Sequence, residues 1–290
     1  MPESRGGVVK VVVESGAQNL LVHPRRTFPG INNLFSMEVA MSSRRPVLSH
    51  TIATKTLVTI TFSLIVVVSI CTLSTLTRAL AATIVSDDFN DNSIDTAKWD
   101  PNNLASGPVT DLNVPIAETG KRLRIGPLLQ NVNGFSYRGL STINTYVFDN
   151  SSAYVELVQA PAVNTNADAA FSVCSDFNDC YRINESAGNL TGVRRTAIGR
   201  GAVEAVLFSI PYDTTNHRFL RIRNDAGNLY LETAPGTGGV PGTWTQQYTE
   251  VWNSQIVTSA VVFELKGGTS QVEANAPGRV IFDNFVASTP

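Results

Sequence analysis

Histidine and cysteine are scarce in this chain, which has three of each among its 290 residues. Of these six residues, only His217, Cys174 and Cys180 follow residue 81. One histidine is too few for a zinc cluster and leaves a single choice for a Ser-His-Asp triad. The sequence also lacks a glycine-rich loop between a strand and a helix, the usual cradle for nucleotide phosphates. These absences argue against the common zinc-dependent, serine-hydrolase and nucleotide-binding classes.

Basic residues are also few in the larger, C-terminal part of the chain. The whole chain holds 22 Lys and Arg against 24 Asp and Glu, and its net charge is −2. Eight of the basic and three of the acidic residues precede residue 82, which leaves 14 and 21 in residues 82–290 and a net charge of −7 there. Nucleic-acid binding depends on clustered Lys and Arg, so we expect no nucleic-acid partner.

One long run of residues carries no charge. Residues 57–76 read LVTITFSLIVVVSICTLSTL, and about 20 apolar residues are enough to cross a bilayer. Arg44, Arg45 and Lys55 precede this run, and small residues around Ala81 follow it. A basic start, an apolar centre and a small-residue exit predict a secretory signal peptide. The alternative is an uncleaved helix that anchors the protein in a membrane.

This interpretation divides the chain into three parts. The signal peptide is predicted over residues 41–81, with cleavage after Ala81. Residues 1–40 stand before a signal that is normally N-terminal, so we interpret them as a disordered leader or as a misassigned start. Residues 82–290 remain as one domain, which is long enough to bury a core. We expect this domain to be secreted, with a membrane contact only through the signal or anchor segment.

The domain reads as a succession of short strands. Apolar or alternating runs are separated by clusters of Gly, Asn, Asp and Pro, and no long run has the 3.6-residue period of an amphipathic helix. The tetrapeptide AGNL occurs at 187–190 and again at 226–229, each time between two alternating runs, and predicts two hairpin turns. The pattern predicts an all-β sandwich or barrel, with strands near 122–128, 137–148, 152–160, 168–175, 180–185, 190–196, 202–209, 217–223, 228–233, 243–250, 258–266 and 279–287.

Cys174 and Cys180 are separated by five residues. This spacing fits no usual zinc motif, and an exported protein matures in an oxidising compartment. We therefore predict a disulfide that staples a hairpin, in preference to a redox or metal-binding pair. A loop this short contributes about 2 kcal/mol at most through chain entropy, so the bond orders a loop without holding the fold together.

Three stretches of the domain are similar to one fold family. Residues 87–99 (DDFNDNSIDTAKW), 217–233 (HRFLRIRNDAGNLYLET) and 280–288 (VIFDNFVAS) resemble the first strand, a hairpin and the last strand of secreted bacterial concanavalin A-like lectin/glucanase domains. Laminin G-like domains and family 16 glycoside hydrolases share that fold. The resemblance implies a two-sheet antiparallel jelly-roll β-sandwich in which the first and last strands lie together and Trp99 packs in the core.

The best-known enzymes of that fold carry the motif E-x-D-x-x-E on one strand, where alternation puts the carboxylates on one face. This chain lacks the motif, because the strand glutamates at 156, 204, 232 and 264 have no acidic partner at the required spacing. We therefore predict no catalytic residues and a secreted, non-catalytic carbohydrate-binding or adhesion module whose partner is a polysaccharide or a cell-surface glycan. The alternatives are a glycoside hydrolase or lyase with a non-standard carboxylate pair and a purely structural extracellular domain.

Two sets of residues are candidate ligand contacts. The resemblance assigns a structural calcium ion to an aspartate of the closing strand, and Asp283 matches that position, with Asp87 or Asp88 beside it. Aspartate oxygens are hard ligands that suit calcium, but aspartates in such clusters also cap turns. Trp244 and Trp252 stand in or near loops and are candidate glycan contacts; the alternative for both is packing. No other cofactor is expected.

Overall fold

The computed structural model describes residues 82–290 apart from 106–109, 131–133, 177 and 200. The described residues belong to one compact unit. The predicted signal peptide, including its cleavage site, lies outside the described residues. Within the described ranges the regular structure is all β, and no helix there is long and apolar enough to cross a membrane.

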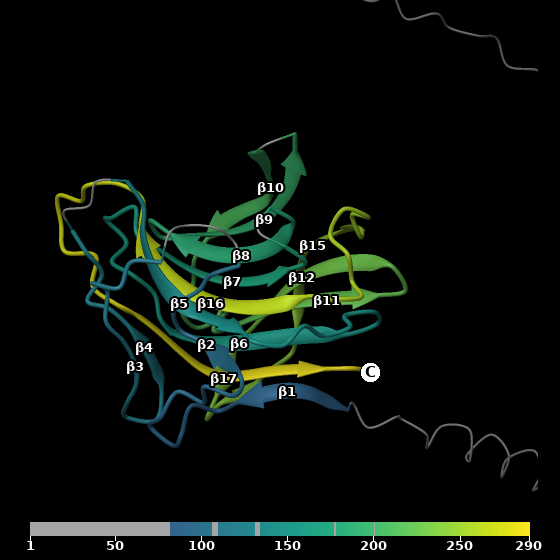
Figure 1. Cartoon of the computed structure of the whole chain (residues 1–290), viewed down its shortest axis with the longest axis horizontal. Helices are drawn as coiled ribbons and strands as arrows, with labels where there is room; N and C mark the ends of the chain where they lie inside the picture. Colours follow the sequence, from purple (N-terminus) through teal and green to yellow (C-terminus); the bar gives the residue numbers. More distant parts are fainter. Residues whose placement is uncertain (1–81, 106–109, 131–133, 177, 200) are drawn as a thin grey trace, which may run out of the picture. The chain divides into compact units, whose positions relative to one another are not determined.

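The larger sheet, called sheet A, has eight strands (Figure 1). Seven follow the order β15-β12-β11-β6-β17-β4-β3, and β1 pairs antiparallel with β17 beside that path. The first and last strands of the domain therefore lie side by side, as the resemblance implied. The strands of sheet A are β1 Thr83–Asp87, β3 Ile116–Glu118, β4 Leu123–Ile125, β6 Ser152–Gln159, β11 Phe219–Asp225, β12 Asn228–Ala234, β15 Thr245–Val251 and β17 Val280–Ser288.

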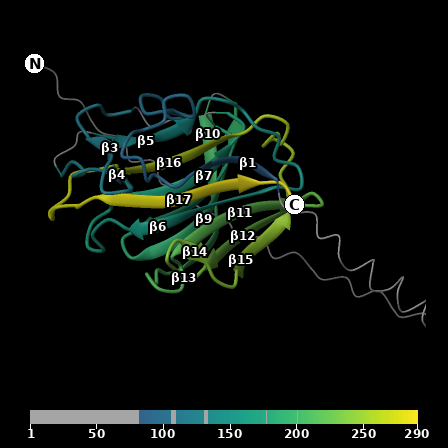
Figure 2. The same ribbon diagram turned by 90° about the horizontal axis from the view of Figure 1, so that it is seen from below.

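Sheet B has seven antiparallel strands in the order β10-β9-β8-β7-β16-β5-β2. They are β2 Trp99–Asp100, β5 Ser136–Thr142, β7 Asp168–Cys174, β8 Cys180–Ser186, β9 Asn189–Ile198, β10 Gly201–Pro211 and β16 Val262–Thr269. A small hairpin of β13 (Gly236–Thr237) and β14 (Val240–Pro241) follows β12 (Figure 2). Two packed antiparallel sheets confirm the β-sandwich that the strand pattern predicted.

Both AGNL tetrapeptides form tight turns, as predicted. Ala187 and Gly188 join β8 to β9 with φ of 51° and 80°. Ala226 and Gly227 join β11 to β12 with φ of 49° and 75°. Two successive residues with positive φ are what a two-residue hairpin loop of type I′ requires. The residues that bend the chain are thus Ala and Gly, because the asparagine of each tetrapeptide already begins the next strand.

Trp99 is fully buried between the sheets and joins the two ends of the domain. Its ring packs against Phe89 and Phe285, with centroid distances of 6.1 and 5.2 Å. Its indole N–H donates to Asp87 Oδ2 over 2.8 Å, which offsets the cost of burying a polar group. The prediction that Trp99 belongs to the core is confirmed.

Candidate functional site

Polar side chains cover the face of sheet B that points away from the core. In β16, Phe263 and Leu265 belong to the core, so alternation gives Glu264 and Lys266 to the opposite face. Ser172 of the adjacent strand β7 is the direct partner of Glu264 and therefore lies on the same face. These three polar side chains are fully buried, although they lie outside the apolar core.

The next strands continue this polar face. Arg182 of β8 lies opposite Ser172, and further out Arg195 of β9 lies opposite Glu204 of β10. Asn184 stands two positions beyond Arg182 on the same strand and therefore on the same face. Charged and amide groups thus run across the sheet from its middle to its edge strand.

A groove of about 430 Å³ lies on this face, and its lining includes Tyr137, Asp168, Asn184 and Glu204. Phe135 stands at the groove with 67% of its surface exposed. Its ring centroid lies 6.3 Å from that of Tyr137. The groove therefore combines an exposed aromatic ring with carboxylate, amide and guanidinium groups.

Hydrogen bonds and ion pairs inside the groove join groups of opposite charge. Arg182 Nη2 lies 2.5 Å from Glu204 Oε1, and the Tyr137 hydroxyl donates to Asp168 Oδ2 over 2.9 Å. Burial raises the pKa of Asp168, against the nearby charges of Lys266 and Arg182 that lower it. Burial also lowers the pKa of Lys266 to about 8, while Glu264 opposes that change.

Several buried polar atoms of this face have no hydrogen-bond partner among the described residues. They are two acceptors, Asp168 Oδ1 and Asn184 Oδ1, and two donors, Arg182 Nε and the Ser172 hydroxyl. Buried polar groups in native proteins are normally satisfied by protein, water or ligand. The four atoms on this face can therefore bond a polar ligand or ordered water, while other such atoms, among them Glu118 Oε2 and Asn224 Oδ1, lie elsewhere in the described residues.

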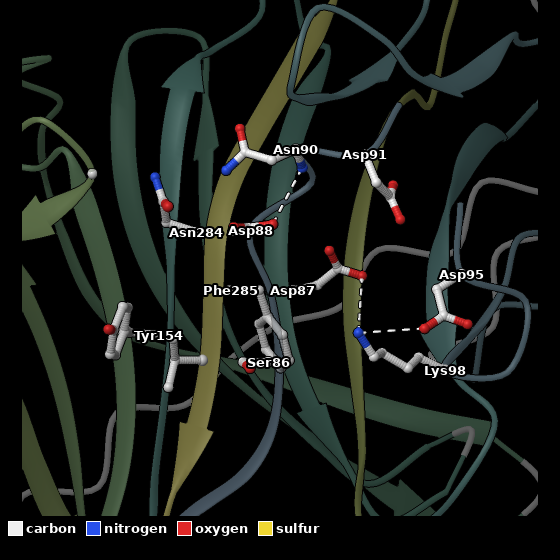
Figure 3. A pocket seen from close by; sticks show the side chains of 12 residues that line it. Ser86, Asp87, Asp88, Asn90, Asp91, Asp95, Lys98, Tyr154, Asn284 and Phe285 are labelled. Atoms are coloured by element: carbon white, nitrogen blue, oxygen red, sulfur yellow. Dashed lines mark hydrogen bonds and ion pairs between the residues drawn. The ribbon is translucent and has the colours of Figure 1, made fainter. Parts of the chain in front are cut away.

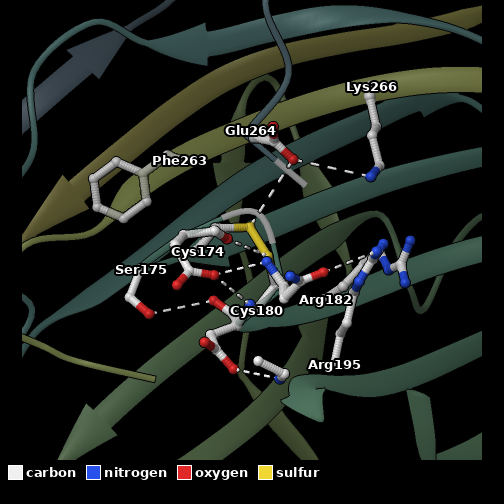
Figure 4. The surroundings of a disulfide bond; sticks show 12 residues. Cys174, Ser175, Cys180, Arg182, Arg195, Phe263, Glu264 and Lys266 are labelled. Carbon is white, nitrogen blue, oxygen red and sulfur yellow. Dashed lines mark hydrogen bonds and ion pairs between the residues drawn. A yellow bond between two sulfur atoms is a disulfide. The ribbon is translucent and has the colours of Figure 1, made fainter. Parts of the chain in front are cut away.

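Cys174 and Cys180 form the predicted disulfide, which joins the ends of β7 and β8 (Figure 4). Cys174 Sγ lies 4.0 Å from Glu264 Oε2, so the bond borders the polar face. Asp179, in the loop that the disulfide closes, accepts a hydrogen bond from the backbone N–H of Ala197 over 2.8 Å. The disulfide thus orders the loop beside one end of sheet B.

A second hollow, of about 620 Å³, lies over the acidic segment that follows β1 (Figure 3). Asp88 Oδ1 accepts a weak hydrogen bond of 3.3 Å from the backbone N–H of Asn90. Lys98 lies 3.9 Å from Asp87 and 3.3 Å from Asp95. Most carboxylates of this segment therefore cap turns or pair with lysine.

Asp283 lies opposite Glu156 across β17 and β6. Burial and the Glu156 carboxylate raise the pKa of Asp283 to about 6, and Asp88 adds to this effect. Asp283 also lies 3.6 Å from the Arg122 guanidinium. In the part of the chain that the structure describes, no three Asp, Glu, His or Cys side chains converge as a metal cluster. A calcium ion at Asp87, Asp88 and Asp283 stays a prediction.

Neither predicted tryptophan lines the groove on sheet B. The Arg221 guanidinium lies over the Trp244 ring, 4.0 Å from the ring centroid. The centroids of the Trp244 and Tyr154 rings are 5.7 Å apart. The Trp252 ring lies 4.7 Å from that of Tyr181, and its N–H donates to the Ile256 carbonyl over 2.7 Å. These contacts are packing contacts, and a ligand role for Trp244 or Trp252 stays a prediction.

The aromatic edge of the groove, formed by Phe135 and Tyr137, was not predicted from the sequence. Tyr137 is the second residue of β5 and Phe135 immediately precedes that strand, and a spacing of two in extended chain puts side chains on one face. That spacing was the available signal. The predicted glycan contacts were Trp244 and Trp252 instead, because tryptophans are the largest aromatic side chains.

Comparison with known proteins identifies the fold. No family model matches the sequence, and no curated protein matches it either. A LamA variant from Z. galactanivorans in complex with laminaritriose and laminaritetraose matches with a TM-score of 0.51 and 9% identity, over 72% of this chain and 99% of that chain. The CBM2 module of the evolved Dit of Lactobacillus casei BL23 phage J-1 matches with a TM-score of 0.53 and 10% identity, over 72% and 95%.

A third solved structure, β-agarase A in complex with oligoagarose, matches with a TM-score of 0.50 and 12% identity, over 72% of this chain and 92% of that chain. At such low identities these likenesses establish the fold alone. The chain has the concanavalin A-like jelly roll that its terminal strands resemble.

Proposed function

We propose, with the concanavalin A-like jelly roll as the premise, that this chain is a secreted, non-catalytic carbohydrate-binding module whose ligand lies in the groove on sheet B. The observation that carries the proposal is the exposed Phe135 ring beside Tyr137, next to a row of carboxylate, amide and guanidinium groups. Aromatic rings offer a flat apolar surface for sugar rings, and the polar groups suit sugar hydroxyls. Solved structures of the same fold hold laminarin and agarose oligosaccharides.

Two carboxyls of the polar face, Asp168 in the lining of the groove and Glu264 outside that lining, stand too far apart to act as a hydrolase pair. Glu264 lies opposite Ser172, and Asp168 lies opposite Gly268, so the two acids are four positions apart along β16, about 13 Å by strand geometry. Lys266 stands between them. Retaining glycosidases need carboxyls about 5 Å apart and inverting ones about 6.5–9.5 Å apart.

An extracellular location agrees with the chain's chemistry. The Cys174–Cys180 disulfide is typical of proteins that mature in an oxidising compartment, and the apolar run at 57–76 predicts export. The partner would then be a polysaccharide or a glycan on a cell surface.

A glycosidase with a displaced carboxylate pair is the second candidate function, and one observation favours it. Glu156 of β6 and Asp283 of β17 are direct partners on adjacent strands. The pKa of Asp283, about 6, suits a general acid. Glu156, however, is held on both oxygens, by Arg218 at 2.7 Å and Asn284 at 2.6 Å. Release of reducing sugar from laminarin, abolished by Glu156→Gln, would support this candidate.

The test of the binding proposal uses the full-length chain on an array of polysaccharides. We expect binding to at least one of them, and Phe135→Ala should weaken it about fivefold, since stacking of an aromatic ring contributes about 1 kcal/mol. Val251→Ala is the control, because Val251 is 75% exposed and lies on the edge strand of sheet A. Absence of binding to every polysaccharide would overturn the proposal.

A further inference from the structure

Glu204 is placed to neutralise the outer part of the groove. It stands on the edge strand β10, and its Oε1 lies 2.5 Å from Arg182 Nη2 and 3.9 Å from Arg195 Nη1. Two guanidinium groups from two other strands thus converge on one carboxylate oxygen. Arg195 also reaches Asn178 Oδ1, at 3.4 Å.

The deeper part of the groove face is balanced in the same way. Lys266 Nζ lies 3.9 Å from Glu264 Oε2. Asp168 lies within range of the positive charges of Lys266 and Arg182. Among the groups named above, the three carboxylates of Asp168, Glu204 and Glu264 stand against the three cations Arg182, Arg195 and Lys266, so these neighbouring charges balance one another.

The unpartnered atoms indicate what the groove recognises. Asp168 Oδ1 and Asn184 Oδ1 accept hydrogen bonds, whereas Arg182 Nε donates. The terminal torsions of Asp and Asn are broad and roughly two-fold, so a small rotation turns these oxygens towards a ligand. A hydroxyl group both donates and accepts and can match both kinds of atom. A carboxylate or sulfate only accepts and would lie against the Asp168 and Glu204 carboxylates.

We infer that the groove takes a neutral polysaccharide, and that Glu204 is the specificity-determining residue that excludes uronic-acid-containing and sulfated chains. This inference rests on the proposed function and names the ligand class of the same groove. Without Glu204, the guanidinium groups of Arg182 and Arg195 would face the ligand without their shared carboxylate. Arginine binds carboxylates and sulfate-like anions through its forked donors, so removing Glu204 would create an anion site. Specificity of this kind depends on a repulsive group as much as on attractive ones.

The substitution Glu204→Gln tests this role without disturbing the core. The Glu204 side chain is 49% exposed, and glutamine keeps its length and its carbonyl oxygen. The matched control is Asp225→Asn, which makes the same change in net charge. Asp225 is 58% exposed and lies 2.8 Å from Arg223 on sheet A. Both variants therefore remove an exposed carboxylate that is paired with an arginine.

The experiment measures binding of the full-length chain to neutral laminarin and agarose and to anionic alginate. The unchanged chain should bind a neutral polymer and not alginate, with little difference between about 0.05 M and 0.5 M salt. Glu204→Gln should raise the affinity for alginate about tenfold at low salt and lose this gain at high salt. Asp225→Asn should behave like the unchanged chain.

Each other outcome has a defined meaning. Alginate binding by the unchanged chain as tight as its binding to laminarin or agarose would overturn the inference. So would an equal gain in both variants, which would reduce the effect to net charge, or no gain in Glu204→Gln. An unchanged chain that binds no polysaccharide would overturn the proposed function. A gain by Glu204→Gln alone in that same experiment would still support the charge-excluding role of Glu204.

Discussion

Glu185 gives the most quantitative prediction about stability. It lies in β8, is 1% exposed, and accepts a hydrogen bond from the backbone N–H of Gly188 over 2.9 Å. Its other oxygen is buried without a partner among the described residues. Burial, together with the nearby Asp168 charge, raises the pKa of Glu185 from 4.5 to about 7, while the Gly188 hydrogen bond lowers it.

The sign of the pH dependence follows from this direction. A carboxyl whose pKa is raised by folding binds its proton more tightly in the folded state, so its contribution to stability is complete below pH 4.5. That contribution is lost as the pH rises towards and through about 7. At about 1.4 kcal/mol per pKa unit, the loss amounts to about 3 kcal/mol.

Glu185→Gln removes the titration while keeping the acceptor for Gly188. Urea unfolding, followed by tryptophan fluorescence, should give similar stabilities for the two chains near pH 4.5 and a variant more stable by about 3 kcal/mol near pH 8. Asp225→Asn is the control, because it removes an exposed carboxyl. Its stability relative to wild type should be the same at both pH values. A difference in stability between wild type and Glu185→Gln that is equal at both pH values would show that Glu185 does not titrate with a raised pKa in the folded chain.

Replacing both Cys174 and Cys180 by serine should lower the free energy of unfolding by about 2 kcal/mol and abolish any effect of a reductant on the melting temperature. A wild-type melting temperature that is unchanged by the reductant would contradict a stabilising contribution of the disulfide. Trp252→Phe removes the donor to the Ile256 carbonyl and should cost about 1 kcal/mol in urea unfolding with polysaccharide binding intact; lost binding at unchanged stability would make Trp252 a ligand contact. If Asp283 holds calcium, excess EDTA should lower the melting temperature and Asp283→Asn should remove that sensitivity. A midpoint that is unchanged in EDTA rules out a structural ion.

Local pattern predicted the strands that have one face in the core. The run at 152–160 became β6, Ser152–Gln159, because alternation there records which side is buried. The run at 137–148 was predicted too long, since β5 ends at Thr142. Phe148 is fully buried outside any strand, so an apolar residue was mistaken for a strand residue.

The groove could not be predicted in the same way. Glu264 and Ser172 face each other from positions 92 residues apart, and Glu204 reaches Arg182 across an intervening strand. Such contacts depend on strand order and register, which short-range spacing does not encode. The meeting of β1 with β17 was predicted through the fold resemblance, because the residues at the two ends of the domain carried that resemblance.

A crystal structure of the chain with an oligosaccharide of the neutral polysaccharide that it binds would show directly whether the groove on sheet B is the binding site. We expect a sugar ring over Phe135, with hydroxyl groups within hydrogen-bond distance of Asp168 and Asn184. Sugar bound in the acidic hollow beside Tyr154 and Asp88, with none in the groove on sheet B, would contradict this expectation.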